Sequence, residues 1–174
     1  LNAVGVPDMK LKFVKEISEP NVSEAQIQRE FETNLSVLEE NLQYVDSFIR
    51  IGNGIVDALA LDEDLRPVLI EFKKPEASEQ DALIQVLDYY TWCVENLEWL
   101  EERIRKTKPD LLKTEEKPSE DIRIMVIARD FEDRVVRIAS ALEPDVELVS
   151  YNFFEKSAEE MGLTYTVVLD TRLT

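Results

Sequence analysis

Three short apolar stretches that follow one another in the first half of the sequence constrain the fold more than any other feature. They cover Tyr44–Ile51, Ile55–Leu61 and Pro67–Lys73, and the turn-forming groups Gly52-Asn53-Gly54 and Asp62-Glu63-Asp64 separate them. Stretches of this length between such turns are typical of β-strands. Because connections this short join neighbouring antiparallel strands, the region predicts an antiparallel meander.

Apolar residues recur at helical spacing before and after this meander. Ser23 and Gln26 have the spacing of a capping box, and they precede a predicted helix over residues 24–40. Further helices are predicted over 78–102 and Phe131–Leu142, and strands over Ile122–Ala128, Val146–Asn152 and Thr164–Leu169, with a weaker leading strand at Lys10–Ile17. This order of elements predicts an α/β sandwich around a mixed sheet.

The size of the chain predicts a single domain, residues 1–174. It has 174 residues, of which 44% are hydrophobic, and this is enough for one packed core. The segment 103–121 is rich in charge and contains two prolines, so we expect an exposed connection there. The apolar runs are too short for a transmembrane helix and the start shows no signal-peptide pattern, so we expect a cytoplasmic protein that does not associate with membranes.

The absence of histidine and the presence of only one cysteine limit the catalytic and metal-binding chemistry that this chain can carry out. The chain has no histidine, which excludes a histidine general base and the usual zinc sites, and its single cysteine, Cys93, cannot form an internal disulfide. Any chemistry must come from carboxylates, lysine, tyrosine or a metal that prefers oxygen ligands. There are 37 acidic and 20 basic residues, and the resulting net charge of −17 argues at first sight against a nucleic-acid partner.

Two acids and a lysine interrupt the apolar strands of the meander. Asp57 lies in the second predicted strand, and Glu71 and Lys73 lie at the end of the third. A hairpin between these strands would place Asp57 beside Glu71, where the two carboxylates repel each other unless a cation lies between them. Such oxygen ligands suit Mg²⁺ or Mn²⁺, and Lys73 would then orient a metal-bound water. Alternatively, Glu71 and Lys73 only line a solvated strand face.

This arrangement resembles the PD-(D/E)XK nuclease superfamily, whose signature is an acid on one strand and (D/E)-x-K on the next. It is most similar to the catalytic domain of the archaeal NucS/EndoMS mismatch endonucleases and related RecB-like domains. The matching features are Glu24 in the first helix, Gly54-Ile-Val-Asp57-Ala-Leu-Ala, Ile70-Glu71-Phe-Lys73-Lys74, and Gln85 with Tyr89 four residues later. The resemblance covers residues 22–153 and implies a restriction-endonuclease-like αβββαβ core, with a mixed central sheet flanked by helices.

The resemblance also implies a role for each matching residue. Asp57 and Glu71 would be metal ligands, together with the carbonyl oxygen of Phe72, and Glu24 would bind the metal directly or through a water. Lys73 would position the attacking water, and Gln85 and Tyr89 would contact the scissile strand or support the site. Taken alone, Glu24 is also a favourable charge in the first turn of a helix, and Gln85 and Tyr89 are ordinary surface-edge residues.

Two functions follow from the sequence and stay open at this point. One is a Mg²⁺- or Mn²⁺-dependent nuclease that hydrolyses DNA phosphodiester bonds. The other is a catalytically inactive nuclease-fold module for protein association or sensing, which is favoured by the net charge and by the short stretch before Glu24, where NucS-type enzymes have a DNA-binding and dimerisation domain. We expect this chain alone to bind DNA weakly, single-stranded or branched DNA included, and a homodimer or a partner subunit to supply tighter binding.

Overall fold

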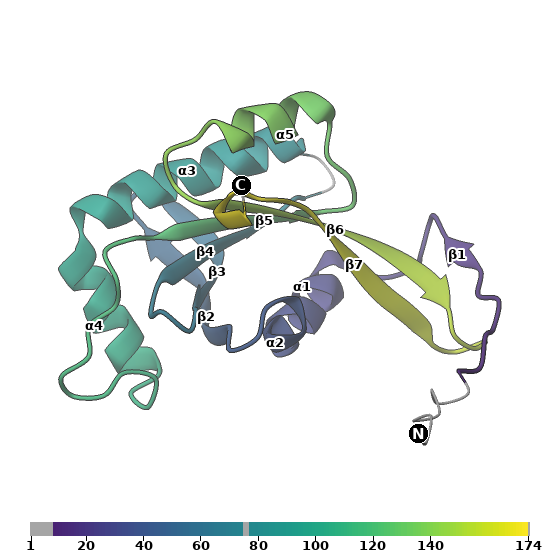
Figure 1. Ribbon diagram of the computed structural model, residues 1–174, viewed down its shortest axis with the longest axis horizontal. Helices are drawn as coiled ribbons and strands as arrows, with labels where there is room; N and C mark the ends of the chain where they lie inside the picture. Colours follow the sequence, from purple (N-terminus) through teal and green to yellow (C-terminus); the bar gives the residue numbers. More distant parts are fainter. Residues whose placement is uncertain (1–8, 75–76, 174) are drawn as a thin grey trace, which may run out of the picture.

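The computed structural model describes residues 9–74 and 77–173, which form one seven-stranded sheet with helices on both faces (Figure 1). The strands are β1 Glu16–Ile17, β2 Gln43–Ile51, β3 Gly54–Leu61, β4 Pro67–Phe72, β5 Arg123–Ala128, β6 Val146–Glu155 and β7 Met161–Asp170. The helices are α1 Glu24–Thr33, α2 Leu35–Leu38, α3 Glu79–Glu95, α4 Leu97–Thr107 and α5 Asp133–Ser140, and a short 3₁₀ helix follows at Thr171–Leu173.

The strand directions confirm the predicted mixed sheet. Strands β2, β3 and β4 form the antiparallel meander, β4 and β5 pair in parallel, and so do β5 and β6. The sheet order is β1-β6-β5-β4-β3-β2, with β7 antiparallel to β6. The restriction-endonuclease-like αβββαβ core expected from the sequence is therefore present, and β7 extends the sheet beyond it.

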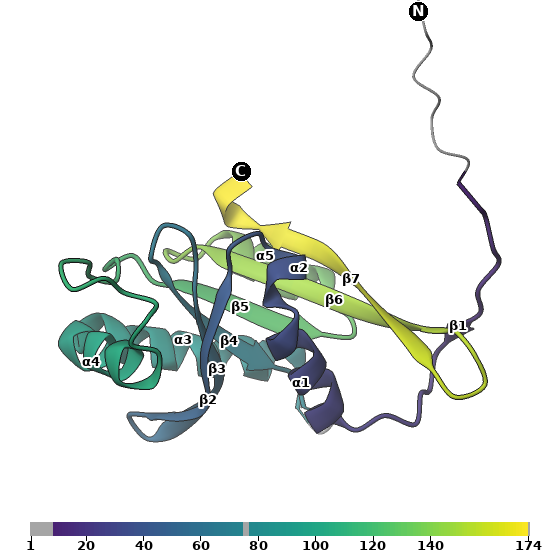
Figure 2. The same ribbon diagram turned by 90° about the horizontal axis from the view of Figure 1, so that it is seen from below.

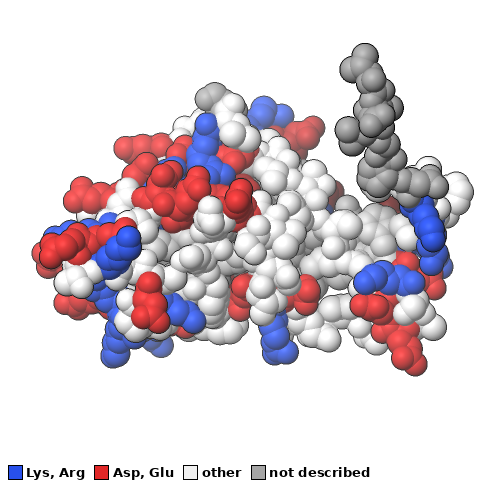
Figure 3. All heavy atoms as spheres, turned by 60° about the horizontal axis from the view of Figure 1, so that its bottom comes forward, with Lys and Arg blue, Asp and Glu red and all other residues white. Residues whose placement is uncertain are grey.

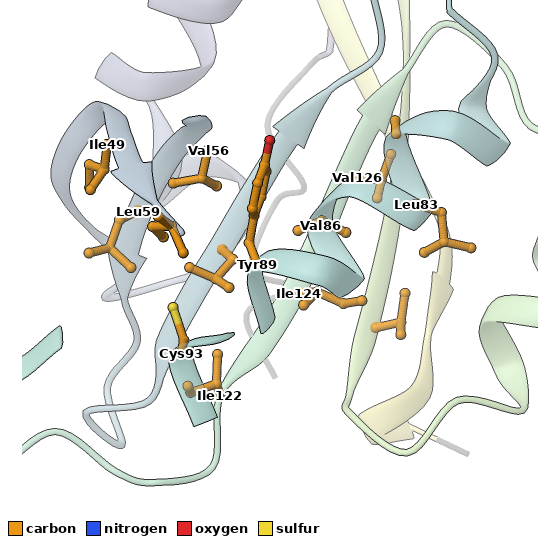
Figure 4. Packing of buried hydrophobic residues seen from close by; sticks show 14 of the residues in the cluster. Ile49, Val56, Leu59, Leu83, Val86, Tyr89, Cys93, Ile122, Ile124 and Val126 are labelled. Atoms are coloured by element: carbon orange, nitrogen blue, oxygen red, sulfur yellow. The ribbon is translucent and has the colours of Figure 1, made fainter. Parts of the chain in front are cut away.

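Two apolar clusters, one on each face, hold the sheet between its helices. The helices α3, α4 and α5 cover one face, where Leu83, Val86 and Cys93 of α3 pack against the strands (Figure 4). The helices α1 and α2 cover the other face through Ile27, Phe31 and Leu35. Strands with helices on both faces have no solvated side, and this explains the near-continuous apolar sequences of β3, β4 and β5.

Two predicted helices are each split by an asparagine. The helix predicted over 24–40 breaks at Asn34, and the one predicted over 78–102 breaks at Asn96. In both places the asparagine side chain donates a hydrogen bond to the carbonyl oxygen four residues earlier, at 2.8 Å. These bonds satisfy carbonyl groups at a helix end and let the chain start a second helix in a new direction.

The exposed connection predicted over 103–121 is wrong at its start and in its middle. Helix α4 continues to Thr107, Ile104 is completely buried, and Leu112 is buried as well. The helical spacing of Leu97 and Leu100 continues to Ile104, and the many charged residues of this stretch made that continuation hard to recognise. The predicted leading strand over Lys10–Ile17 is also mostly absent, because only Glu16 and Ile17 pair with β6. No helix in the described part of the chain is long and apolar enough to cross a membrane.

Candidate active site

Asp57 and Glu71 face each other where strands β3 and β4 separate. The last paired residues of the two strands are Ala58 and Ile70, one position before this point. Beyond Ala58 and Ile70, the backbone N–H groups bond to side-chain carboxylates in place of the carbonyl groups of the neighbouring strand. The Asp57 N–H donates to Glu71 Oε2 at 3.4 Å, and the Phe72 N–H donates to Asp57 Oδ2 at 2.8 Å. Asp57 is 3% exposed and Glu71 is 1% exposed. The structure thus buries two carboxylates side by side.

This burial changes the proton affinity of both groups. Burial raises the pKa of Glu71 to about 8, and the negative charge of Asp57 contributes in the same direction. Burial also raises the pKa of Asp57, while the hydrogen bond from the Phe72 N–H opposes this shift. No lysine or arginine among the described residues forms an ion pair with either group. A pair of this kind favours a shared proton or a bound cation.

Two neighbouring lysines lie beside the carboxylates and differ in their surroundings. Lys73 is half-buried, its N–H bonds to the Ile127 carbonyl at 2.9 Å, and its Nζ donates to the Lys74 carbonyl at 3.3 Å. Lys74 is exposed, and its positive charge lowers the pKa of both Asp57 and Glu71. Lys73, which the sequence resemblance assigned to water positioning, is thus held by hydrogen bonds to the backbone. Its neighbour Lys74 supplies positive charge near Asp57 and Glu71.

Tyr89 of α3 reaches the same end of the meander. It is 8% exposed, and its ring extends from α3 toward β3 beside Val56 (Figure 4). Burial raises the pKa of its hydroxyl, with further contributions from the charges of Glu71 and Asp57, while a backbone hydrogen bond at Ile55 opposes the shift. The structure therefore brings Tyr89 to the carboxylates. Gln85, one helical turn earlier, is exposed.

Helix α1 approaches Asp57 through residues that the sequence reasoning missed. Gln28 Nε2 donates to the Asp57 carbonyl at 3.2 Å and to Glu32 Oε1 at 2.8 Å. Glu32 also accepts a hydrogen bond from Ser47 Oγ at 2.6 Å, and its charge raises the pKa of Asp57. Gln28 and Glu32 follow Glu24 by four and eight residues, so all three lie near one face of the helix. This spacing is the feature of the sequence that could have indicated their role.

Glu24 itself is exposed in the first turn of α1. Burial raises the pKa of Tyr151, the charge of Arg129 opposes this shift, and the charge of Glu24 adds to it. Glu30, which lies on another side of the helix, accepts a hydrogen bond from Asn34 Nδ2. Glu32 is thus an acid of α1 whose charge acts on Asp57. The structure brings together Asp57, Glu71 and Tyr89, and Lys73 and Lys74 follow Glu71 two and three residues later in the chain.

The donor set suits an oxygen-preferring divalent ion. Asp57 and Glu71 supply two carboxylates, and in the described ranges no group of three or more histidine, cysteine or acidic side chains is placed to hold a metal. Proteins often bind Mg²⁺ through one or two carboxylates, with waters and substrate phosphate completing the octahedron. Two buried carboxylates without an ion-paired partner therefore fit such an ion.

No protein-family model matches the sequence, and no curated protein matches it. Two solved structures resemble the chain. One is a crystal structure of a repair endonuclease from Pyrococcus abyssi, with 18% sequence identity, a TM-score of 0.43, and coverage of 76% of this chain and 48% of that chain. The other is an EndoMS complex with double-stranded DNA, with 22% identity, a TM-score of 0.38, and coverage of 71% and 45%.

This chain spans about half the length of each, as the 48% and 45% coverage shows.

Proposed function

We propose that this protein is a Mg²⁺- or Mn²⁺-dependent nuclease that hydrolyses DNA phosphodiester bonds. The observation that carries the proposal is the pair of buried carboxylates, Asp57 and Glu71, at the point where β3 and β4 separate. Two carboxylates buried side by side can both be charged only at a large cost in free energy, and a divalent ion between them would offset that cost. The burial of this pair therefore favours a metal-binding role over a purely structural one.

Each residue of the site has a role in this proposal. Asp57, Glu71 and the Phe72 carbonyl would hold the ion, and Glu24 would contribute directly or through a water. When bound, the ion would supply Lewis-acid catalysis and a water of lowered pKa.

The remaining side chains would handle water and substrate. Lys73, held by the Lys74 carbonyl, would orient the attacking water, and the exposed ammonium of Lys74 would offset charge on the phosphate. Tyr89 would support the carboxylates, and Gln85, exposed on the same helix face, would contact the DNA strand. Glu32 would act on Asp57 through its charge and would position α1 through Gln28.

The net charge of −17 is compatible with DNA as the substrate. Acidic side chains gather densely on the half of the molecule that holds α4 (Figure 3), away from the centre of that face. Beside the carboxylates, Lys73, Lys74 and Arg50 would form a modestly basic rim. We infer that this chain binds DNA weakly by itself, with a strong dependence on salt, and that it acts in the cytoplasm.

The test is cleavage of labelled single-stranded, branched and mismatched DNA in Mg²⁺ or Mn²⁺. We expect Asp57→Asn and Glu71→Gln to abolish cleavage, Lys73→Ala to slow it by about 10²–10⁴-fold, and Lys74→Ala to slow it less. The exposed acids Asp64 and Glu63 provide matched controls, because Asp64→Asn and Glu63→Gln remove the same charges elsewhere.

Cleavage that is unchanged in Asp57→Asn and Lys73→Ala would contradict the proposed site. If the wild-type chain cleaves none of these substrates in either metal, the nuclease proposal is wrong and the inactive-module alternative replaces it.

A further inference from the structure

The segment Met9–Lys15 is extended and carries its apolar side chains in water. Met9, Leu11 and Phe13 are 80%, 98% and 104% exposed, and Lys10 and Lys12 alternate with them. In an extended chain, alternate residues share a face, so Met9, Leu11 and Phe13 lie on one face and Lys10, Lys12 and Val14 on the other. Figure 2 shows it running away from the body of the molecule beyond β1. A strand-like pattern of this kind is typical of a segment that pairs with a surface.

A groove on the α1–α2 face of the sheet has the complementary chemistry. It lies between α1–α2 and β7, has a volume of about 670 Å³, and includes Ile27, Val37, Met161 and Leu163 in its lining. Glu30, Glu159 and Glu160 also line it, together with Lys156, which forms an ion pair with Glu160 at 3.3 Å. We call it the α1–β7 groove. The centre of this face, over α1, α2 and β7, carries few charged side chains (Figure 3).

Strand β7 borders this groove and is open to a further strand. Among the described residues it pairs only with β6. Its residues 161–169 include no charged side chain, although a third of the whole chain is charged. Edge strands usually carry lysine, proline or bulges that limit association. Residues 161–169 of β7 include no lysine and no proline, and the register of β7 with β6 shifts between Val167 and Leu169.

We propose that the segment Met9–Lys15 of one copy of this chain docks in the α1–β7 groove of a second copy. Met9, Leu11 and Phe13 would enter the groove, and the lysines between them would meet the acidic side chains of its lining. The lengths agree, because Met9–Phe13 and the lining residues Met161–Tyr165 are both five-residue stretches of extended chain. The charges agree as well, since the segment is basic and the rest of the chain is strongly acidic.

The position of the segment favours a second copy over its own groove. The Lys15 carbonyl accepts the Glu155 N–H at 2.8 Å, and Glu16 and Ile17 pair with β6. Strand β7 pairs with the same part of β6, so β1 lies on the opposite edge of β6 from β7. To reach its own groove, the segment would have to turn back around the β6–β7 hairpin. In a twofold dimer each copy would donate one segment and receive one.

Sedimentation velocity of the whole chain over a range of concentrations, at physiological ionic strength, tests this proposal. We expect a reversible dimer. Phe13→Asp should weaken association at least about tenfold, because it places a charge in the apolar groove. Val14→Asp is the matched control, since it makes the same change at the adjacent residue on the other face, and it should change the association constant by less than about twofold. Both residues are exposed, so neither change should affect folding.

A second experiment exchanges the charges of the groove and of the segment. Glu159→Lys with Glu160→Lys should weaken the dimer, and adding Lys10→Glu with Lys12→Glu should restore it. A chain that stays monomeric, equal effects of Phe13→Asp and Val14→Asp, or no restoration by the charge exchange would overturn the proposal. A monomer whose groove is protected from hydrogen exchange by its own segment would also overturn it.

Discussion

At the scale of single residues, the contact between Gly54 and Tyr89 explains why glycine begins the strand that carries Asp57. A Cβ atom added at Gly54 would lie 2.4 Å from Tyr89 Cε1 and 2.6 Å from its hydroxyl oxygen. Distances this short are far below van der Waals contact, so the glycine makes room for the tyrosine ring next to the carboxylates. The sequence pattern contained both residues, but their contact depends on how α3 packs on the sheet.

We predict that Gly54→Ala lowers both stability and DNA cleavage, because the new methyl group displaces the Tyr89 ring. Overpacking of this kind costs about 1–3 kcal/mol of unfolding free energy, measurable by urea denaturation. Gly162→Ala is the control, since its Cβ would lie 3.4 Å from the flexible side chain of Lys156 and should cost little. Equal effects of the two substitutions would show that Tyr89 does not fill this space.

At the scale of secondary-structure elements, a buried ion network joins the ends of several strands. Arg123 of β5 is 1% exposed and bonds to Glu39 after α2, Asp62 after β3 and Glu147 of β6, at 2.8–3.2 Å. Arg172 adds an ion pair to Glu39 at 3.1 Å. Acids outnumber basic groups in this network, and burial with the charge of Asp170 raises the pKa of Glu147 to about 7, against the opposing charge of Arg123.

We predict that Glu147→Gln removes a pH dependence of stability. The pKa of Glu147 is higher in the folded chain than the ordinary value of 4.5, so its contribution is complete below about pH 4.5 and is lost as the pH rises through 7. The stability of Glu147→Gln relative to wild type should therefore increase between about pH 5 and pH 9, by on the order of 2–3 kcal/mol.

Thermal unfolding at several pH values measures this effect, and Glu155→Gln, an exposed change at the end of the same strand, is the control. A difference between Glu147→Gln and wild type that stays constant over this pH range would contradict the buried, protonated state of Glu147.

Turn and capping residues in the sequence predicted the elements whose formation depends on residues close together in the chain. The meander followed from its short turns, and the capping box at Ser23 and Gln26 is present in the structure. The breaks at Asn34 and Asn96 were not predicted, because helical spacing continues on both sides of each asparagine. The roles of Gln28 and Glu32 could not be predicted either, since they depend on which face of α1 packs against β3.

At the scale of the whole molecule, a strongly acidic chain places two of its acids in a buried pair. Most charges lie at the surface, where water solvates them, and the buried acids of the ion network form ion pairs with Arg123. Asp57 and Glu71 are different, because no ion-paired cation among the described residues compensates them. The fold thus places two buried carboxylates, without an ion-paired partner in the described part of the chain, at one end of the meander, where Lys74 is the neighbouring positive charge.

Titration of the chain with Mn²⁺ by isothermal calorimetry tests this account most directly. We predict that the wild-type chain binds Mn²⁺ and that Asp57→Asn and Glu71→Gln each weaken binding at least about tenfold, because each removes one of two charged ligands. The controls Asp64→Asn and Glu63→Gln should bind as the wild type does. Mn²⁺ binding that is the same in all five proteins, or no binding by the wild type, would contradict a metal centre at Asp57 and Glu71.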